Sequence, residues 1–391
     1  MPENAPIQKL RVCHVITRMI IGGAQENTLL TVRGLLERGH EAVLLTGPTH
    51  GPEGKLLESM EFPGLKVIEE PTLVREINPL TDIRAFLRLK RFFRKEEFDI
   101  VHTHSSKAGI VGRLAARAAG VPLVLHTVHG QAFHKYEKSW RNKLYILAER
   151  RAAKASDHIF AVAQAMVEQC VDANIAPRDK YSVVYSGMDL QPYLPTTPDM
   201  ELKKNLGIPA TAPVIGKIAR LFELKGHEYL LEAAPDIVRK IPEVRFLLVG
   251  DGILREQLQQ TVAARGLQEN FVFAGLVPPD EIPKYVSIMD VLVHLSLREG
   301  LPRTVVQALA GGIPAVAYDL DGTPEVVQNG TTGYLCPPQS TAEVRDALLE
   351  LLENPGKATR MGHAGRELVK ERFNWRTMVR QLEEAYLSML A

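Results

Sequence analysis

The residues of this 391-residue sequence with the most specific chemistry form the segment Arg298-Glu299-Gly300-Leu301-Pro302-Arg303. Glu299 follows an apolar run typical of a buried strand, and a helical pattern begins near Arg303. The free N–H groups at the start of a helix can bind an anion. A carboxylate in the preceding loop can accept hydrogen bonds from the hydroxyls of a sugar. Gln307, one turn into the helix, is expected to point toward the same pocket.

Two cations, Arg220 and Lys225, come at the end of an earlier strand-like run, in the segment GKIARLFELKG. An arginine suits two phosphate oxygens at once, whereas a lysine acts as a point charge, so together they can hold a diphosphate. Two solvated loop charges are the ordinary alternative. We favour the diphosphate role because ligands of parallel sheets bind at the carboxyl ends of the strands.

Gly22-Gly23-Ala24 follows the first strand-like run and begins the first helical pattern. Glycines let the backbone approach a ligand closely, and the start of the helix carries a partial positive charge. A phosphate, or an acceptor hydroxyl beside one, fits this description, and a tight strand–helix turn fits it equally well. The spacing is not G-x-G-x-x-G, and no acidic residue is well placed about 20 residues further on, which disfavours a dehydrogenase.

Five histidines gather at the ends of two further strand-like runs. The spacing His102-x-His104 places both rings on one face of a strand, and histidine is a common zinc ligand. Because no cysteine or well-spaced carboxylate completes a metal site, we favour packing and hydrogen-bonding roles for most of them. His129 differs, because it stands just past a strand and before a glycine, where residues of a ligand cleft lie. The full set is His102, His104, His126, His129 and His134.

All of these residues stand at the ends of strand-like runs that alternate with helical patterns along the whole chain. Several runs, such as RVCHVIT (11–17) and EAVLLT (41–46), are apolar on both faces, as strands of a buried parallel sheet are. Strand–helix alternation predicts βαβ units in a doubly wound α/β fold. A segment rich in proline and turn formers (186–199) interrupts the alternation and is interpreted as an interdomain linker. The remaining strands are expected at 99–104, 122–127, 158–162 and 181–185, and then at 212–219, 244–250, 270–275, 290–295, 314–318 and 333–336.

Helices are predicted between these strands, and the tail from about residue 356 to 391 has a helical pattern throughout. The length of the chain fits two domains, each able to bury a core. The predicted helices cover 24–38, 81–95, 107–119 and 140–155 in the first half, and 226–240, 252–265, 280–288, 303–310 and 341–353 in the second.

Composition excludes several classes of protein. With 45% hydrophobic and 24% charged residues the chain resembles an average globular protein, and its net charge of +1 disfavours nucleic acid as a partner. Three cysteines without CxxC spacing favour a reducing compartment. The sequence has neither a run of about 18 apolar residues nor a signal peptide in its opening MPENAPIQKL. We therefore expect a cytoplasmic protein.

Residues 84–154 are strongly basic, with 16 Lys and Arg residues against five Asp and Glu residues. Apolar and aromatic residues such as Phe86, Leu87 and Trp140 lie among these charges. Basic and aromatic residues together suit an anionic membrane surface. An ordinary solvated helix face is an equally weighted alternative, so a peripheral position at the inner face of the plasma membrane is one of two expectations.

Taken together, the motifs resemble the large family of retaining glycosyltransferases with the GT-B fold, family 4 (glycosyl transferases group 1). The resemblance covers nearly the whole chain, and the second-half motifs are its specific part. It implies two Rossmann-like domains with an interdomain cleft: an acceptor-binding domain (1–187), a nucleotide-sugar-binding domain (188–373) and a C-terminal helix (374–391) that returns to the first domain. The residues that carry it are Gly22-Gly23, His129, Arg220, Lys225-Gly226, Glu299-Gly300-Leu301-Pro302, Gly311-Gly312-Ile313-Pro314 and Thr323-Pro324-Glu325-Val326-Val327.

What the resemblance implies is a hexosyltransferase that uses a nucleotide-diphosphate sugar, with UDP-hexose or UDP-N-acetylhexosamine favoured. The acceptor would be a glycan or a polyprenyl-diphosphate-linked sugar, and the anomeric configuration would be retained without a metal or another cofactor. The residues matching Arg220 and Lys225 bind the diphosphate, the one matching Glu299 binds the donor sugar, and the one matching His129 lies beside the reacting sugar. The implied catalytic set is His129, Arg220, Lys225 and Glu299, and the donor-binding set is Gly22, Gly23, Arg220, Lys225, Glu299, Gly300, Leu301, Pro302, Arg303 and Gln307.

One position departs from the family pattern. The family usually has a second glutamate eight residues after the first, which accepts both ribose hydroxyls, and this chain has Gln307 there. An amide loses the charge-assisted pair, which costs about 1–2 kcal/mol of donor binding. A non-catalytic nucleotide-sugar-binding protein is therefore kept as an alternative. A nucleotide-sugar epimerase, which would share the fold, is the other alternative.

Asp319-Leu320-Asp321 has the D-x-D form that binds metal in a different transferase fold. Here it precedes Thr323-Pro324-Glu325 in a loop, and aspartates favour turns because their side chains bond the local backbone. We interpret these aspartates as turn residues and expect no metal there.

Overall fold

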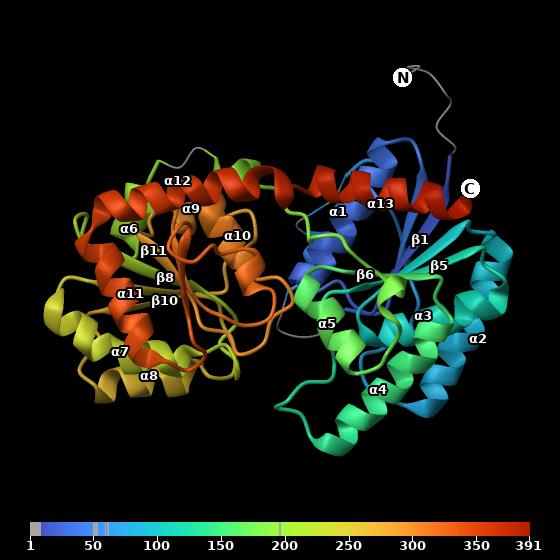
Figure 1. Ribbon diagram of the computed structural model, residues 1–391, viewed down its shortest axis with the longest axis horizontal. Helices are drawn as coiled ribbons and strands as arrows, with labels where there is room; N and C mark the ends of the chain where they lie inside the picture. Colours follow the sequence, from blue (N-terminus) through green and yellow to red (C-terminus); the bar gives the residue numbers. More distant parts are fainter. Residues whose placement is uncertain (1–8, 50–53, 59, 61, 195–196) are drawn as a thin grey trace. The chain divides into compact units, whose positions relative to one another are not determined.

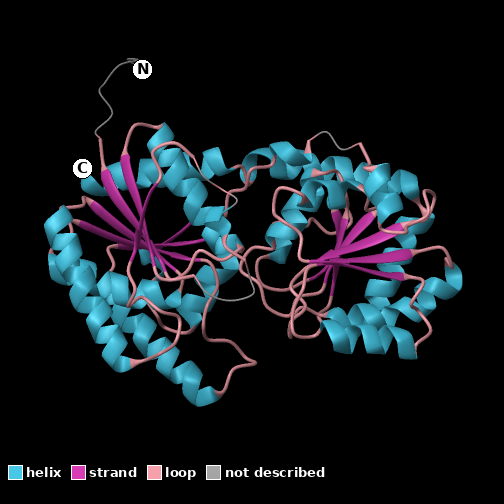
Figure 2. Ribbon diagram, turned by 180° about the vertical axis from the view of Figure 1, so that it is seen from behind, coloured by secondary structure: helices cyan, strands magenta, loops and turns pink. Residues whose placement is uncertain are grey.

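The computed structural model describes residues 9–49, 54–58, 60, 62–194 and 197–391. The chain divides into two compact units, Met1–Met188 with Trp375–Ala391, and Asp189–Asn374. Each unit is a parallel sheet with helices on both faces, as the ribbons show (Figure 1; Figure 2, strands magenta and helices cyan). The doubly wound α/β class predicted from strand–helix alternation is therefore confirmed.

The first unit has a seven-stranded sheet in the order β3-β2-β1-β4-β5-β6-β7. The chain moves outward from β1 to one edge and then returns to add β4 on the other side. Ligands of doubly wound sheets bind at such a reversal of strand order, beyond the carboxyl ends of the strands. The strands are β1 (Arg11–Ile16), β2 (Glu41–Thr46), β3 (Lys66–Glu69), β4 (Ile100–His104), β5 (Leu123–Val128), β6 (His158–Ala161) and β7 (Tyr181–Val183).

Helices cover both faces of this sheet. On one face, Val12 and Ile16 of β1 pack with residues of α1 and α13, and on the other Cys13 and Val15 pack with residues of α2 and α3. Both faces of β1 are thus buried and, apart from His14, apolar, which is why its sequence has no alternation of polar residues. The helices are α1 (Gly23–Glu37), α2 (Pro79–Glu96), α3 (Ser106–Ala119), α4 (Ser139–Lys154), α5 (Gln164–Asp172) and α13 (Trp375–Leu390).

The predicted continuous helical tail is wrong at one place. Helix α12 (Pro355–Arg372) ends before Phe373, and α13 begins at Trp375. The Trp375 N–H donates to the Met188 carbonyl at 3.2 Å, which fixes the start of α13 in the first unit. Its apolar stripe packs on α1, where a Cβ at Gly34 would lie 2.5 Å from Val379 Cγ2. Glycine there allows the two helices to approach closely.

The second unit has a six-stranded parallel sheet in the order β10-β9-β8-β11-β12-β13. Its strand order reverses between β8 and β11, as the first sheet does between β1 and β4. The strands are β8 (Val214–Ile218), β9 (Arg245–Val249), β10 (Phe271–Gly275), β11 (Val291–His294), β12 (Ala315–Tyr318) and β13 (Gly333–Cys336). The helices besides α12 are α6 (Met200–Asn205), α7 (His227–Lys240), α8 (Arg255–Ala264), α9 (Ile282–Ser287), α10 (Arg303–Ala310) and α11 (Thr341–Glu353).

Three elements were not predicted from the sequence. Strand β3 is an edge strand whose Val67 is 39% exposed, so it lacks the apolar run that marked the other strands. Helices α5 and α6 have only nine and six residues, too few for a helical period to stand out.

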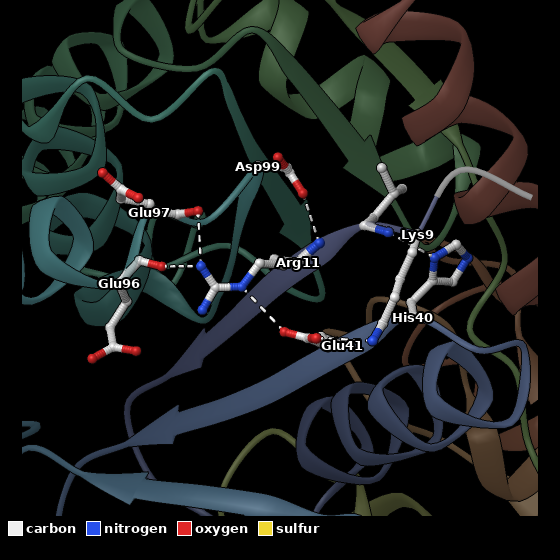
Figure 3. Close-up of polar contacts among 8 residues, drawn as sticks. Lys9, Arg11, His40, Glu41, Glu96, Glu97 and Asp99 are labelled. Atoms are coloured by element: carbon white, nitrogen blue, oxygen red, sulfur yellow. Dashed lines mark hydrogen bonds and ion pairs between the residues drawn. The ribbon is translucent and has the colours of Figure 1, made fainter.

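The amino edge of the first sheet is held by paired charges (Figure 3). The Arg11 N–H donates to Asp99 Oδ2 at 2.7 Å, and Arg11 Nε donates to Glu41 Oε2 at 3.1 Å. Lys9 Nζ lies 2.9 Å from Glu41 Oε1, and the Arg11 guanidinium also donates to the carbonyl of Glu97 at 3.3 Å. These contacts join the starts of β1, β2 and β4. The charged side chains at this edge therefore hold the strands together.

Two further findings bear on where the protein acts. Cys13, Cys170 and Cys336 are all buried and free. In the described parts of the chain, no helix is both long enough and apolar enough to span a membrane.

Candidate functional site

The carboxyl edge of the second sheet brings two of the predicted residues together. Lys225, in the loop after β8, places Nζ 2.5 Å from Oε1 of Glu299, in the loop after β11. Both side chains are partly buried, at 23% and 17% exposure. They come from neighbouring strands, since β8 and β11 pair directly. The ion pair therefore lies where ligands of a doubly wound sheet bind.

Backbone contacts hold the two loops together. The Leu297 N–H donates to the Leu224 carbonyl at 2.8 Å, and a Cβ at Gly226 would lie 2.0 Å from the Leu295 carbonyl oxygen. Gly226 also has a φ of +66°, so glycine is required there by both space and conformation. The Glu299 N–H donates to Asp321 Oδ2 at 2.8 Å, and Asp321 has a φ of +52°. Asp321 thus supports the Glu299 loop through a long-range contact, which the interpretation of Asp321 as a local turn residue did not include.

Glu299 is ionised in this setting. Burial favours the protonated acid, but the Lys225 ammonium outweighs it and holds the pKa of Glu299 well below its usual range. His294, at the end of β11, has its Nε2 3.5 Å from Glu299 Oε1. Burial lowers the pKa of His294, so we treat it as a neutral neighbour and Lys225 as the counter-charge of Glu299.

Lys217 is a buried cation that we did not single out from the sequence. It lies in β8 with 2% exposure, and its side chain makes no hydrogen bond or ion pair with any residue that the structure describes. Burial, with the repulsion of Lys225, lowers the pKa of Lys217 to about 7. The same edge has buried polar atoms without a hydrogen-bond partner among the described residues, namely His227 Nδ1, His294 Nε2 and Ser296 Oγ. Such atoms are costly unless a ligand or water binds them.

The other predicted donor-binding residues of the second unit are Arg220, the residues that lead into α10, and Gln307. Arg220, exposed at the end of β8, lies over the Phe222 ring at 5.0 Å, and its carbonyl accepts from His227 Nε2 at 3.0 Å. Pro302 caps α10 in a non-helical conformation, and Gln307 is partly buried one turn into that helix. Gly300, Leu301, Pro302 and Arg303 therefore form the loop and the first residue of α10, with Leu301 and Pro302 buried.

Gly22, Gly23 and His129 lie at the carboxyl edge of the first sheet. Gly22 precedes α1 in an extended conformation, and Gly23 is the first residue of the helix. A Cβ at Gly22 would lie 2.7 Å from Gln25 Oε1, the end of a flexible side chain. His129 stands just after β5 and is partly buried. These three residues belong to the first unit, and the Lys225–Glu299 pair belongs to the second.

His129 is the outer end of a chain of histidines. His104 Nδ1 lies 2.9 Å from His129 Nε2, and His104 Nε2 lies 2.9 Å from His14 Nδ1. His102 makes separate bonds, to Tyr386 Oη at 2.5 Å and to Thr127 Oγ1 at 2.7 Å. His126 Nδ1 lies 2.9 Å from Thr103 Oγ1. His102, His104 and His126 are thus hydrogen-bonding residues, as we favoured from the sequence.

His14, His102 and His104 have ring nitrogens within 4.8 Å of one another, which is close enough for a metal grouping. Their geometry argues against metal binding. The rings of His102 and His104 stack at 4.6 Å and 20°, so their in-plane lone pairs cannot converge on one ion. Both nitrogens of His102 are also bonded to hydroxyl groups. The cluster fits a hydrogen-bond network better than a zinc site.

A pocket lies beside His129 in the first unit. It is lined by polar residues that include His126 and the fully buried Arg113, and by apolar residues that include Phe133 and Ile159. Arg113 Nη2 donates to Glu149 at 2.6 Å, whereas its Nη1 has no partner among the described residues. This pocket lies at the ends of β4 and β5, next to His129.

Sequence reasoning missed His14, Lys217 and His294. Each is a titratable residue inside an otherwise apolar strand, in RVCHVI, VIGKI and VLVH. A polar residue at such a position is itself a signal, because burial is costly unless a partner or ligand compensates.

Family models match most of the chain. The model described as "Glycosyl transferase 4-like domain" matches residues 22–187, and "Glycosyl transferases group 1" matches residues 199–368. The two matches cover most of the first and second units respectively.

Several characterised proteins are similar over nearly their whole length. The UDP-Gal:alpha-D-GlcNAc-diphosphoundecaprenol alpha-1,3-galactosyltransferase of Escherichia coli is 30% identical over 386 residues, 98% of each chain. The N-acetyl-alpha-D-glucosaminyl L-malate synthase of Bacillus anthracis is 26% identical over 361 residues, 91% of each chain. The structure of HepE from Anabaena with UDP has the same fold, with a TM-score of 0.80, 24% identity and coverage of 97% and 100% of the two chains. The chain therefore belongs to the group 1 glycosyltransferases of family 4, enzymes of GT-B fold that bind nucleotide sugars and transfer the sugar.

Proposed function

We propose that this enzyme transfers a hexose or N-acetylhexosamine from a UDP-linked donor to a glycan or polyprenyl-diphosphate-linked acceptor, with retention of configuration and without a metal. The observation that carries the proposal is the Lys225–Glu299 pair at the carboxyl edge of the second sheet. The names of two relatives support the substrates, since one uses UDP-Gal with a diphosphoundecaprenol-linked acceptor and HepE binds UDP.

In this proposal the two residues of the ion pair, Lys225 and Glu299, bind different parts of the donor. Lys225 and the exposed Arg220 bind the diphosphate, while Glu299, already ionised, accepts hydrogen bonds from the donor sugar. The N–H groups at the start of α10, after Gly300-Leu301-Pro302, add a partial positive charge to the same edge. Gly22 and Gly23 offer the equivalent start of α1 in the first unit.

The chemical step is same-face substitution through an oxocarbenium-like state. The bond from the anomeric carbon to the UDP oxygen breaks, and the bond from that carbon to the acceptor oxygen forms on the same face. The proton of the acceptor hydroxyl goes to the departing phosphate oxygen. Arg220 and Lys225 stabilise the charge that develops on UDP, and His129 lies beside the reacting sugar, so catalysis rests on positioning and electrostatics.

The proposal is tested by combining purified enzyme with UDP-Gal, UDP-Glc, UDP-GlcNAc or GDP-Man and with a short polyprenyl diphosphate carrying GlcNAc. UDP release and product mass report transfer, and the anomeric proton coupling of the product reports its configuration. We expect acceptor-dependent release with one UDP-sugar, an α-linked product, and the same rate in the presence of EDTA.

Other outcomes would replace the proposal. Conversion of the donor sugar with no acceptor present would identify an epimerase. Tight donor binding without release of UDP under any acceptor condition would identify a non-catalytic binding protein. An inverted product would exclude the same-face mechanism, and loss of activity in EDTA that is restored by a divalent cation would exclude metal independence.

We further propose that the first unit contacts an anionic membrane, where a polyprenyl-linked acceptor resides. Helix α2 exposes an apolar stripe of Leu80, Ile83 and Leu87, which are 72%, 58% and 57% exposed. Helix α4 exposes Trp140 at 61% and Leu144 at 49%. Both helices pack on α3 in the same unit (Figure 1). Basic residues line a groove beside Leu87, at one end of the stripe: Arg88, Lys90, Arg91, Arg94 and Lys95.

Co-sedimentation with vesicles tests the membrane proposal. The enzyme should bind vesicles containing anionic lipid at low salt and dissociate at high salt, because Lys and Arg residues supply part of the attraction. Replacing Arg91 and Lys95 by glutamate should abolish binding, whereas replacing Arg239, an exposed arginine of α7, should leave it unchanged. Absence of binding by the wild-type protein at low salt would end this proposal.

A further inference from the structure

We propose that Lys217 is a positioning residue for the donor: when a diphosphate binds beside Lys225 and Glu299, Lys217 takes up a proton and becomes the counter-charge of Glu299, so that Lys225 can bind the diphosphate. The proton comes from the solvent, and Lys217 acts through its charge alone. The inference rests on the proposed function, which assigns the diphosphate to Lys225.

Lys217 lies on an apolar face of β8. Because successive residues of a strand point to opposite faces, Lys217 shares its face with Ile215. Ile215 belongs to the apolar core that α7 covers, and so does Leu248, the residue opposite Lys217 on β9. The side chain of Lys217 is only 2% exposed. It is also the last residue but one of β8, so this buried amine lies at the end of the strand that leads to Lys225.

A lysine buried in this way destabilises the fold unless a ligand compensates. Lys217 makes no hydrogen bond or ion pair within the described parts of the chain. Burial, and then the repulsion of Lys225, lower the pKa of Lys217 to about 7. A buried ammonium without a partner has lost its hydration and gained no acceptor in return. A methionine would fill this position without that cost, so the amine points to a role in function.

Lys203 shows how the same unit accommodates a buried lysine in a structural role. It is 8% exposed, and its Nζ donates to the carbonyls of Ala210 and Ala212 at 3.0 and 2.9 Å. Two fixed acceptors thus replace the water that this ammonium lost on burial. Lys217 has no such acceptors in the described structure, which favours a role linked to a ligand.

The charged groups that act on Lys217 lie at the edge assigned to the donor. Lys225, in the loop after β8, repels a charged Lys217, whereas Glu228, at the start of α7, and Glu299, in the loop after β11, attract it. Glu228 is exposed, and Glu299 is partly buried. Because Lys225 Nζ lies 2.5 Å from Glu299 Oε1, the buried carboxylate already has a counter-charge when no ligand is bound.

Two histidines also face Lys217. His227, the first residue of α7, has its Nε2 3.0 Å from the Arg220 carbonyl, and His294 ends β11. Burial lowers the pKa of both rings, and the charge of Lys217 adds to this shift. Both histidines are therefore neutral near pH 7 and remain so at higher pH. Lys217 is the described group of this cluster whose pKa lies near neutrality.

A bound diphosphate changes this balance of charge. It brings negative charges to an edge where one ammonium, Lys225, already neutralises Glu299. The added negative charge favours the ammonium form of Lys217, so its pKa rises on binding. A proton is then taken up when the diphosphate binds and returned when it leaves. Because uptake and affinity are linked, diphosphate binding should weaken as the pH rises above 7.

The direct test is calorimetric titration of UDP into the full chain at pH 8, in two buffers of different ionisation enthalpy. UDP is fully ionised at this pH, because the second pKa of a phosphate is about 6. The difference in heat between the buffers gives the number of protons taken up. We expect about one proton per UDP for the wild type and none for Lys217→Met. No uptake by the wild type, or equal uptake by Lys217→Met, would overturn the inference.

Two matched variants separate this role from a structural one. Lys217→Met should weaken UDP binding at pH 7 by at least about tenfold, and it should raise the denaturant midpoint of the free protein, because it removes an unpaired buried amine. Lys203→Met should keep the wild-type affinity and lower the midpoint, because two carbonyls lose their donor. Wild-type affinity or a lowered midpoint in Lys217→Met would overturn the inference. Proton uptake by the wild type decides the question if a variant does not fold.

The inference and the proposed function fail separately. If UDP does not bind, the titration is made with GDP, because the inference concerns the diphosphate and not the base. A protein that binds the nucleotide with proton uptake but transfers no sugar would refute the function and leave the role of Lys217 intact. An active transferase that binds the nucleotide without proton uptake would refute the role of Lys217 and leave the function intact.

Discussion

The carboxyl edges of the two sheets have a similar strand topology but different side-chain chemistry. At the carboxyl edge of the first sheet, buried histidines bond to one another and to hydroxyl groups, with pKa values lowered so that they stay neutral. At the carboxyl edge of the second sheet, Lys225 and Glu299 form an ion pair next to the buried Lys217. Both edges follow a reversal of strand order, where ligands of this class of fold bind.

The difference indicates that the two edges suit different chemical groups of the substrates, which we call a division of labour. Fixed charges suit a ligand that is itself charged, such as the diphosphate of a nucleotide sugar, because complementary charges stabilise it both before and after bond cleavage. Neutral imidazoles suit hydroxyl groups, which need a donor or acceptor of defined direction. The family membership establishes that a nucleotide sugar binds, and the contrast supports our proposal that its diphosphate binds to the second unit.

The largest effect is expected from removing the charge of Lys225. In Lys225→Ala the departing UDP loses a cation and Glu299 is left partly buried without its counter-charge, so kcat should fall by about 10²–10³-fold. Steady-state kinetics with saturating acceptor measures this. Near-wild-type turnover would show that the charged edge is not the diphosphate site.

A matched control is available in the same unit. Lys284 forms an ion pair with Glu281 at 2.8 Å, but on the surface of α9, at 52% and 42% exposure. Lys284→Ala should leave kcat and KM unchanged, because exposed pairs of this kind contribute little to stability. A loss equal to that of Lys225→Ala would point to a general effect of lysine removal.

The next effect concerns pH and the buried Lys217. Its pKa is about 7 in the fold and about 10.5 when exposed, so between these values the unfolded chain holds a proton that the folded chain lacks. Stability should therefore rise with pH across this window, by at most about 1.4 kcal/mol per pH unit from this residue. Denaturant unfolding from pH 7 to 10 should give a shallower rise for Lys217→Met than for the wild type. The exposed Lys204→Met is the control, and an unchanged slope in Lys217→Met would contradict the burial argument.

The parts of the fold and of the candidate site that could be predicted are those that leave a local pattern in the sequence. Strands such as EAVLLT were placed to the residue, because strands buried on both faces are continuous apolar runs. The exposed edge strand β3 has no such apolar run, and α5 is too short for a helical period to be recognised. Motif residues at strand ends, such as Glu299 and His129, were found because loops interrupt the apolar pattern.

The internal contacts of each edge could not be predicted. That Lys225 and Glu299 form an ion pair depends on the pairing of β8 with β11, which are separated by two strands in the sequence. The histidine chain depends in the same way on the register of His14 against β4. A local pattern does not contain such long-range register, and the roles of the individual site residues stay predictions until variants are measured.

A smaller effect, in the opposite direction, is expected at Gln307 on α10. If it contacts the ribose, Gln307→Glu restores a charged acceptor and should tighten donor binding by about 1–2 kcal/mol, or roughly tenfold. Thermal shift or calorimetry across UDP-, GDP- and ADP-sugars would measure this. Weaker binding of every nucleotide sugar by Gln307→Glu would place the ribose elsewhere.

The most direct test of the division of labour is calorimetric titration of UDP into three proteins: the wild type, Lys225→Ala and His129→Gln. UDP carries the diphosphate but no sugar, so it isolates the role assigned to the charged edge. We predict that Lys225→Ala weakens UDP binding by at least about tenfold, while His129→Gln binds UDP as the wild type does. Wild-type affinity in Lys225→Ala, or a loss of affinity confined to His129→Gln, would contradict the assignment of the diphosphate to the second unit.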